Sequence, residues 1–154
     1  MKENERIGLV EIYTGKGKGK TTAALGLALR AAGHGMWTYV IQFMKGREYC
    51  GELGTVESLD GAITIKQMGR EAFVDKSNPA PEDIELARAT LSLASEVVLT
   101  GKYNIVILDE INMALDFGLI DIDGVIDIID RKPAHVELIL TGRNEPTSSP
   151  RWWR

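Results

Sequence analysis

The stretch Tyr13–Thr22, YTGKGKGKTT, constrains the fold of this chain more than any other part of the sequence. Alternating glycine and lysine occur both in flexible basic linkers and in loops that bind polyphosphate, so the flanking segments must decide. Residues 7–13 (IGLVEIY) are typical of a short strand largely buried on both faces. The segment after the loop predicts a helix that stops at Gly33, with apolar residues at helical spacing: Leu25, Ala28, Leu29 and Ala32. Strand, glycine-rich turn and helix is the context that a phosphate-binding loop requires.

The residue types in this loop fit phosphate chemistry. Its glycines allow backbone turns closed to other residues and bring N–H groups against phosphate oxygens. Lys20, at the expected start of the helix, is placed to reach the outer phosphates, and the Thr21 hydroxyl is placed to bind Mg²⁺. The general pattern G-x-x-x-x-G-K-[ST] has glycine where this chain has Thr14, so the loop is one residue short. The geometry common in hydrolases is therefore not assumed.

Length and composition indicate one globular domain. The chain has 154 residues, 44% hydrophobic and 26% charged, which is enough for a proper core. Its net charge of -4 argues against a general nucleic-acid binder, so the lysine-rich loop points to a small anionic ligand. A single cysteine cannot form an internal disulfide, and we see neither a signal peptide nor a membrane-length apolar run. We therefore expect a cytoplasmic protein with no membrane partner.

Strand and helix patterns alternate along the chain. After the first helix, strands are predicted at residues 36–43, 62–67, 104–108 and 136–140. A helix is expected from near Pro81 to about Thr100, and helical residues around 125–129. This alternation predicts an α/β fold of the P-loop NTPase-like (RecA-like) kind, with a mostly parallel sheet covered by helices, over residues 1–143.

Two acids follow the apolar run at residues 105–108, namely Asp109 and Glu110. Ligands of open α/β sheets bind beyond the carboxyl ends of the strands, so these acids should face the phosphate loop. A triphosphate brings Mg²⁺, which takes oxygen ligands, and a carboxylate there would complement Thr21. The alternative is that two acids simply end a strand. A small P-loop ATPase, with Glu110 as its water-orienting base, also remains open.

Four segments in order carry a more specific signal: EIYTGKGKGKTTAALGLALRAAGHG, VIQFMKG, NIVILDEINMALDFGLI and VELILTGR. Together they resemble the ATP:corrinoid adenosyltransferase family of the CobA/CobO/BtuR type, from about Ile7 to Arg143, including its short loop. The resemblance implies transfer of the 5′-deoxyadenosyl group of ATP to the cobalt of a reduced corrinoid, with release of triphosphate. It implies ATP and a corrinoid as substrates and Mg²⁺ as the metal, together with a homodimer and an unidentified reductase that supplies cobalt(I).

The resemblance also implies roles for individual residues. Lys20, Thr21 and Glu110 would be catalytic, with Thr21, Asp109 and Glu110 at the metal. Arg143, at the end of the last strand, would face the same crevice, although a solvated strand-end charge is a close alternative. The phosphate-loop roles fall on Gly15, Lys16, Gly17, Lys18, Gly19, Lys20, Thr21 and Thr22.

The corrin side is less well defined. Some family members carry a Phe-x-Trp pair after the third strand, where this chain has Phe73, Val74 and Asp75 and so lacks the tryptophan. Phe73 is then a candidate corrin contact or, equally, a hydrophobic anchor for its loop. Four residues after the metal acids could also border the corrin: Asn112, Met113, Asp116 and Phe117.

The last segment departs from the family pattern. Residues 144–154, NEPTSSPRWWR, contain turn formers and no periodicity, so we expect a poorly ordered tail. The alternative is that Trp152 and Trp153 cover exposed core. An altered tail also keeps open a third function, that of an ATP-binding regulator without chemistry.

Overall fold

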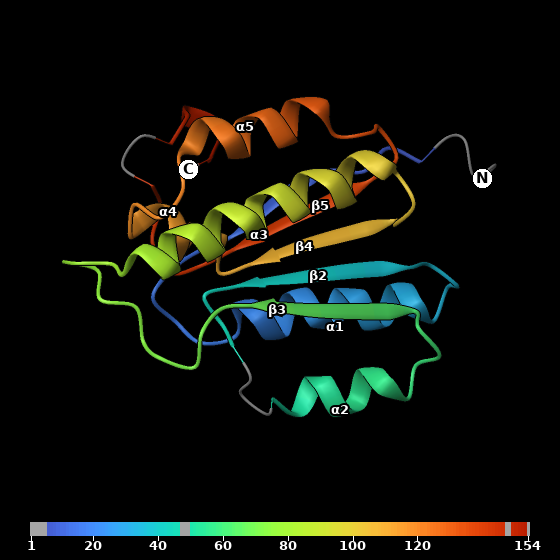
Figure 1. Cartoon of the computed structure of the whole chain (residues 1–154). Helices are drawn as coiled ribbons and strands as arrows, with labels where there is room; N and C mark the ends of the chain where they lie inside the picture. The colour runs from blue at the N-terminus through green and yellow to red at the C-terminus, as the bar shows by residue number, and fades with distance from the viewer. Residues whose placement is uncertain (1–5, 47–49, 147–148, 154) are drawn as a thin grey trace.

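A five-stranded sheet forms the centre of the molecule (Figure 1). The computed structural model describes residues 6–46, 50–146 and 149–153. All four strand pairings are parallel, in the order β1-β5-β4-β2-β3. The strands are β1 (Val10–Tyr13), β2 (Thr38–Phe43), β3 (Ile63–Met68), β4 (Ile105–Asp109) and β5 (Glu137–Thr141). The predicted α/β fold with a parallel sheet is confirmed.

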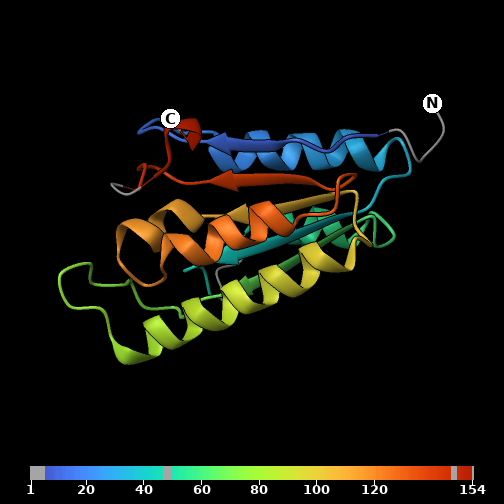
Figure 2. The ribbon, with the colours of Figure 1, turned by 90° about the horizontal axis from the view of Figure 1, so that it is seen from above.

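Helices cover both faces of this sheet (Figures 1 and 2). One face carries α1 (Lys20–Ala32) and α2 (Gly51–Glu57). The other carries α3 (Pro81–Thr100), α4 (Ile111–Asp116) and α5 (Ile122–Arg131). The strand arrows point the same way in Figure 2, so the carboxyl ends of the strands and the loops that follow them gather at one end of the molecule.

The central strand β4 explains why its sequence is continuously apolar. Ile105 and Ile107 pack on the side of α1, whereas Val106 and Leu108 pack on the side of α3 and α5. All four residues are buried, as expected for a parallel strand covered on both faces. The same strand then delivers Asp109 to its carboxyl end.

Local signals set the ends of the long helices. Gly19 precedes α1 in the left-handed region, at φ 107°, and Gly33 follows it as predicted. The buried face of α1 consists of alanines that let the helix approach the sheet closely. Leu29 is at the predicted helical spacing but is 54% exposed, so it lies outside the buried face. For α3 the predicted bounds are confirmed: Pro81 is its first residue and Thr100 its last.

β1 differs from the sequence prediction. We expected a strand buried on both faces, but its residues are only partly buried, and the preceding Ile7 and Leu9 are 76% and 59% exposed. The reason is its position, because β1 lies at an edge of the sheet and pairs with β5 alone. A run of β-branched residues does not distinguish an edge strand from a central one.

The C-terminal segment also differs from expectation in its described part. Arg151–Trp153 form a 3-10 turn, and Trp153 is only 3% exposed within the core on the α3 and α5 face. The Asn144 side chain donates a hydrogen bond to Asp116 Oδ2 at 2.8 Å. The burial of Trp153 favours the alternative interpretation, in which this tryptophan covers the core. Two short helices, α2 and α4, were not predicted either.

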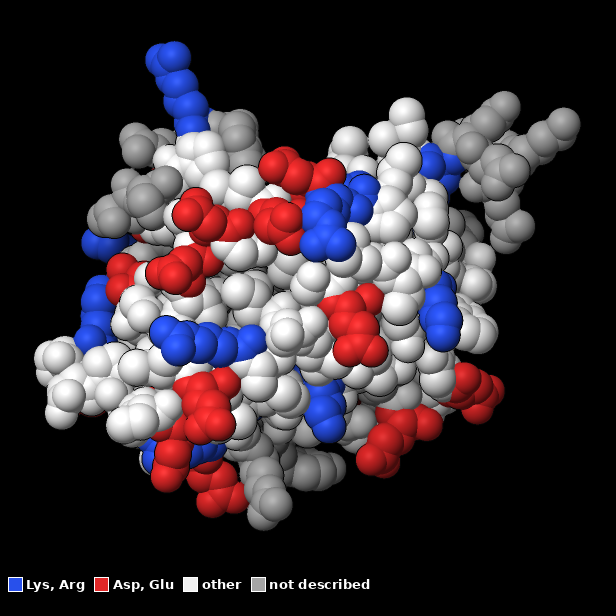
Figure 3. Space-filling model, turned by 45° about the horizontal axis from the view of Figure 1, so that its top comes forward, with Lys and Arg blue, Asp and Glu red and all other residues white. Residues whose placement is uncertain are grey.

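Charged side chains are mixed on the face covered by α3 and α5. In Figure 3 acidic and basic groups of the described residues are interspersed among uncharged atoms. None of the described helices combines the length and the hydropathy needed to cross a bilayer.

Candidate functional site

The glycine-rich loop lies between β1 and α1 at the carboxyl end of the sheet. Gly15 and Gly19 have φ values of 119° and 107°, which residues with a Cβ rarely adopt. Lys20 Nζ donates hydrogen bonds to the carbonyl oxygens of Gly15 at 2.7 Å and Gly17 at 2.5 Å, so its ammonium group lies over the loop. The Gly15 N–H in turn donates to the Arg143 carbonyl at 3.2 Å, which ties the loop to the end of β5.

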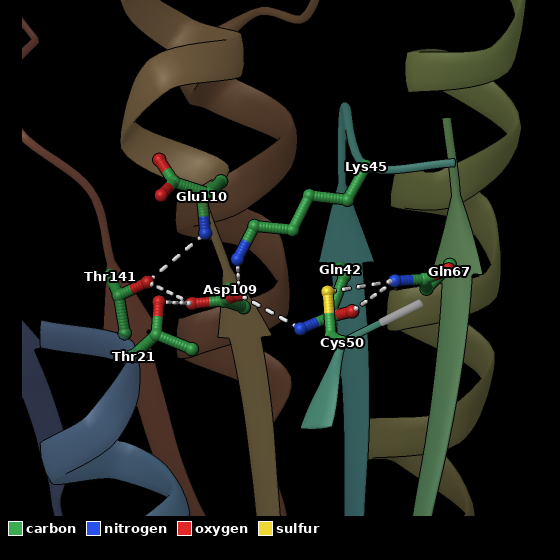
Figure 4. A network of polar contacts seen from close by, with 8 residues as sticks. All are labelled: Thr21, Gln42, Lys45, Cys50, Gln67, Asp109, Glu110 and Thr141. Atoms are coloured by element: carbon green, nitrogen blue, oxygen red, sulfur yellow. Dashed lines mark hydrogen bonds and ion pairs between the residues drawn. The ribbon is translucent and has the colours of Figure 1, made fainter. Parts of the chain in front are cut away.

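Asp109 is the centre of a buried polar network (Figure 4). Its side chain has no exposure to solvent, and both carboxylate oxygens accept hydrogen bonds. Oδ1 accepts from the hydroxyls of Thr21 at 2.8 Å and Thr141 at 2.7 Å. Oδ2 accepts from Gln42 Nε2 at 3.2 Å and Lys45 Nζ at 2.8 Å. Asp109 therefore holds the Thr21 hydroxyl at the phosphate loop, as expected from the strand-end rule.

Glu110 sits in a costly environment. Its φ of 63° lies in the left-handed region, which costs a residue with a Cβ about 1–2 kcal/mol. Its N–H donates to Thr141 Oγ1 at 3.0 Å, and its carboxylate points away from Asp109 in Figure 4. Burial raises the pKa of Glu110, and the charge of Asp109 raises it further, whereas nearby cations lower it. Those cations are Lys45, Lys20 and Arg143.

The oxygen donors here are of the type that Mg²⁺ prefers. Thr21, Asp109 and Glu110 contribute a hydroxyl and two carboxylates. Across the described residues, no group of three or more His, Cys, Asp or Glu side chains could hold a metal ion by itself. This sparse set fits Mg²⁺, which usually takes one or two carboxylates and completes its octahedron with phosphate oxygens and water.

A pocket of about 260 Å³ adjoins the network. Phe73 stands 98% exposed at its rim. The sequence-predicted corrin residues Met113 and Phe117 line the pocket together with Phe73, whereas Asn112 and Asp116 do not. Asn112 is fully buried, and Asp116 bonds Lys76 at 2.7 Å outside this pocket.

Two ion pairs fix the loop that carries Phe73. The Arg70 guanidinium donates to both carboxylate oxygens of Asp83, at 2.7 and 2.6 Å, near the start of α3. Lys76 bonds Asp116 and lies 5.6 Å from the centroid of the Phe117 ring. Hydrogen bonding from Arg70 lowers the pKa of Asp83, and that from Lys76 lowers the pKa of Asp116, so both carboxylates stay charged. Such pairs hold the loop at both ends.

The structure thus brings together most of the predicted site. Thr21 is directly bonded to Asp109, and Glu110 lies within electrostatic range of Lys20 and Arg143. Lys16 and Lys18 are exposed on the phosphate loop, and Thr22 lies in the first turn of α1. Sequence reasoning missed three members of the network: Gln42, Lys45 and Thr141. The segment VIQFMKG, which holds the first two, carried part of the resemblance but no assigned role.

Comparison with known proteins agrees with this geometry. The sequence profile of the ATP:corrinoid adenosyltransferase BtuR/CobO/CobP family matches residues 6–149. A corrinoid adenosyltransferase of Pseudomonas aeruginosa is 34% identical over 136 residues, which cover 88% of this chain and 66% of the relative. One from Sinorhizobium sp. is 36% identical, covering 89% and 64%. The corrinoid adenosyltransferase CobA of Salmonella typhimurium is 31% identical, covering 90% and 69%.

The chain spans 64–66% of the length of the first two of these relatives. The matched part nevertheless contains the phosphate loop, both acids and all of β1 to β5. A profile match over nearly the whole chain, with the loop and acids joined through Thr21 and Asp109, settles the relationship. This chain belongs to the ATP:corrinoid adenosyltransferase family.

Proposed function

We propose that this protein transfers the 5′-deoxyadenosyl group of ATP to the cobalt(I) of a reduced corrinoid. The cobalt electron pair forms the bond to C5′ while the bond between C5′ and its oxygen breaks, and that electron pair leaves with triphosphate. Cobalt ends as an alkylated cobalt(III). Because cobalt(I) is itself a strong nucleophile, the step needs no general base; it needs orientation and neutralisation of the leaving group.

One observation carries the proposal. The phosphate loop and an apolar pocket open at the same end of the sheet. Lys45 connects them, because it lines the pocket and bonds Asp109, which in turn accepts a hydrogen bond from Thr21. A polyphosphate on the loop would lie next to an aromatic and aliphatic surface made by Phe73, Met113 and Phe117. A hydrolase needs only water at that place, whereas a transfer to a large flat acceptor needs an apolar wall.

The chain's own residues would then divide the work. Loop N–H groups and Lys20 bind the triphosphate and neutralise the charge that grows on it. Asp109 orients the Thr21 hydroxyl, and Glu110 supplies a carboxylate, so that Thr21, Asp109 and Glu110 would hold Mg²⁺ directly or through water. When bound, Mg²⁺ supplies additional positive charge to the leaving triphosphate.

The experiment is a product assay with MgATP and a chemically reduced corrinoid. We expect triphosphate and adenosylated corrinoid in equal amounts, measured by chromatography and by the absorbance of the corrinoid. ADP and phosphate released without corrinoid would instead indicate the ATPase in which Glu110 orients water. ATP binding without any product would indicate the regulator. The names of the relatives support neither alternative.

Cellular context is part of the same proposal. We propose a cytoplasmic homodimer that receives cobalt(I) from a separate reductase, as membership of this family implies. Light scattering of the purified chain tests the dimer. The need for a reductase is tested by an assay that replaces the chemical reductant with cell extract and measures the adenosylated corrinoid.

A further inference from the structure

Lys45 is a charged residue shared by the two halves of the site. Its ammonium nitrogen lies 2.8 Å from Asp109 Oδ2, and the residue also lines the apolar pocket. The Lys45 side chain is 26% exposed, whereas the Asp109 side chain is not exposed at all. The ion pair therefore connects the buried network to the wall of the pocket. Figure 4 shows the side chain extending from the end of β2 towards the end of β4.

The backbone around Lys45 is tightly constrained. Met44 has a φ of 62°, which turns the chain sharply after β2 at a cost of about 1–2 kcal/mol. The loops after β2 and β3 then touch backbone to backbone at two glycines. A Cβ on Gly46 would lie 2.2 Å from the Gly69 carbonyl oxygen, and a Cβ on Gly69 would lie 2.4 Å from the Met44 carbonyl carbon. Only glycine fits both positions, so the Cα of Lys45 is held in place.

Asp109 uses its two oxygens differently. Oδ1 receives the two threonine hydroxyls, whereas Oδ2 receives Lys45 and the Gln42 amide. Lys45 is the charged donor of the four, and charge-assisted hydrogen bonds are roughly twice as strong as neutral ones. Lys45 therefore has a large share in setting the carboxylate plane, and through it the position of the Thr21 hydroxyl.

We infer that Lys45 is a positioning residue that couples the pocket to the phosphate loop, an inference that rests on the proposed function. A flat apolar occupant of the pocket excludes water from the exposed part of Lys45. The ion pair with Asp109 strengthens in the lower dielectric, and Thr21 is held more firmly for the metal and phosphates. Because such coupling is reciprocal, a corrinoid and MgATP each tighten the binding of the other.

The test compares wild type, Lys45→Met and Lys66→Met. Methionine keeps an apolar stem against the pocket and removes the charge. Lys66 is exposed on β3 and serves as the matched control. The dissociation constant of MgATP is measured anaerobically by calorimetry, with and without saturating cob(II)alamin, which lacks the electron needed for transfer. We expect cob(II)alamin to lower this constant at least about fivefold in wild type and in Lys66→Met. In Lys45→Met the ratio should fall to within about twofold of one.

A second set of variants tests whether Lys45 acts through Asp109. If it does, the double variant Lys45→Met/Asp109→Asn should bind MgATP as weakly as Asp109→Asn alone, because the second change removes nothing further. The double variant leaves neither partner of this ion pair as an unpaired buried charge, so it should fold even if Lys45→Met does not. Its MgATP affinity can then still be compared with that of Asp109→Asn. Losses that simply add would overturn the positioning role.

The remaining outcomes separate this inference from the proposed function. Wild type that binds cob(II)alamin and shows the same coupling ratio as Lys45→Met would overturn the role of Lys45 and leave adenosyl transfer standing. Wild type that binds MgATP but no corrinoid would overturn the proposed function, and the coupling with it.

Discussion

On the phosphate-loop side of the site the key side chains already have protein partners, whereas on the pocket side Phe73 stands 98% exposed. Lys20 is hydrogen-bonded to two backbone carbonyls of the loop, and Thr21 is hydrogen-bonded to Asp109. Polyphosphate recognition depends on backbone N–H groups that must be arranged in advance. An apolar acceptor needs only a surface that it can cover. The two halves therefore place different demands on the fold, and variants should separate them.

The largest effect is expected from Lys20→Ala. This change removes a charge-assisted contact to a leaving group whose charge grows in the transition state, so turnover should fall by roughly 10²-fold or more. Steady-state adenosylation and thermal unfolding measure the result, with Lys66→Ala as the control. Near-normal turnover in Lys20→Ala would show that Lys20 does not stabilise the leaving triphosphate.

The second prediction concerns the C-terminal tail, which packs on the core between the sheet and the helices α3 and α5. Trp153 is 3% exposed in the same core cluster against which Val74 and Phe117 pack. Trp153→Ala should lower the free energy of unfolding by about 3 kcal/mol, measured by urea denaturation. Arg151→Ala, at an exposed neighbouring position, should change it little. Equal stability of the two variants would mean that burial of Trp153 does not stabilise the core.

Phe73→Ala sharpens the comparison on the pocket side. The ring is almost fully exposed, so its loss should leave thermal stability unchanged. If a corrinoid covers the ring, truncation should raise the KM for corrinoid about tenfold and leave the KM for ATP unchanged. Ile7→Ala, an exposed apolar truncation outside the pocket, should affect neither constant. A rise in the KM for ATP alone would indicate that Phe73 contacts the nucleotide and not the corrinoid.

The smallest effect is a pH dependence at Glu110. Burial raises the pKa of this carboxyl, so the folded state binds its proton more tightly than the unfolded state does. The contribution of Glu110 to stability therefore falls as pH rises from its ordinary pKa through the raised one. Glu110→Gln should be more stable than wild type at about pH 8 and nearly equal at about pH 4, in urea denaturation without nucleotide or metal. A variant less stable at the higher pH would show that its cationic neighbours outweigh burial.

Most of the phosphate-loop side could be predicted from sequence because its signals are local. Gly19 and Lys20 mark the start of α1, and Asp109 follows from the rule that strand ends share one edge. Lys45 could not be found in this way. Its position depends on the positive φ of Met44 and on the contact between Gly46 and Gly69, which lie in loops after different strands.

The errors have the same origin. Residues 7–13 read as a buried strand, but their burial depends on where β1 stands in the sheet, which no local pattern encodes. Trp153 lies in a segment without periodicity, and its burial depends on a gap in the core formed by distant elements. The resemblance identified the family, and the tertiary contacts then corrected the details.

The pairing of β1 with β5 has a consequence for how the protein is made. Val10 pairs with Leu138, and the Gly15 N–H reaches the Arg143 carbonyl, so the first strand to leave the ribosome has its partner among the last. Contacts that distant in sequence form late and slow folding. We expect the strands β2, β3 and β4 to assemble first, with β1 and its glycine loop held back until β5 is available. Nascent chains that stop before β5 would then contain the loop sequence but would not bind phosphate, because the loop would lack its contact with the end of β5.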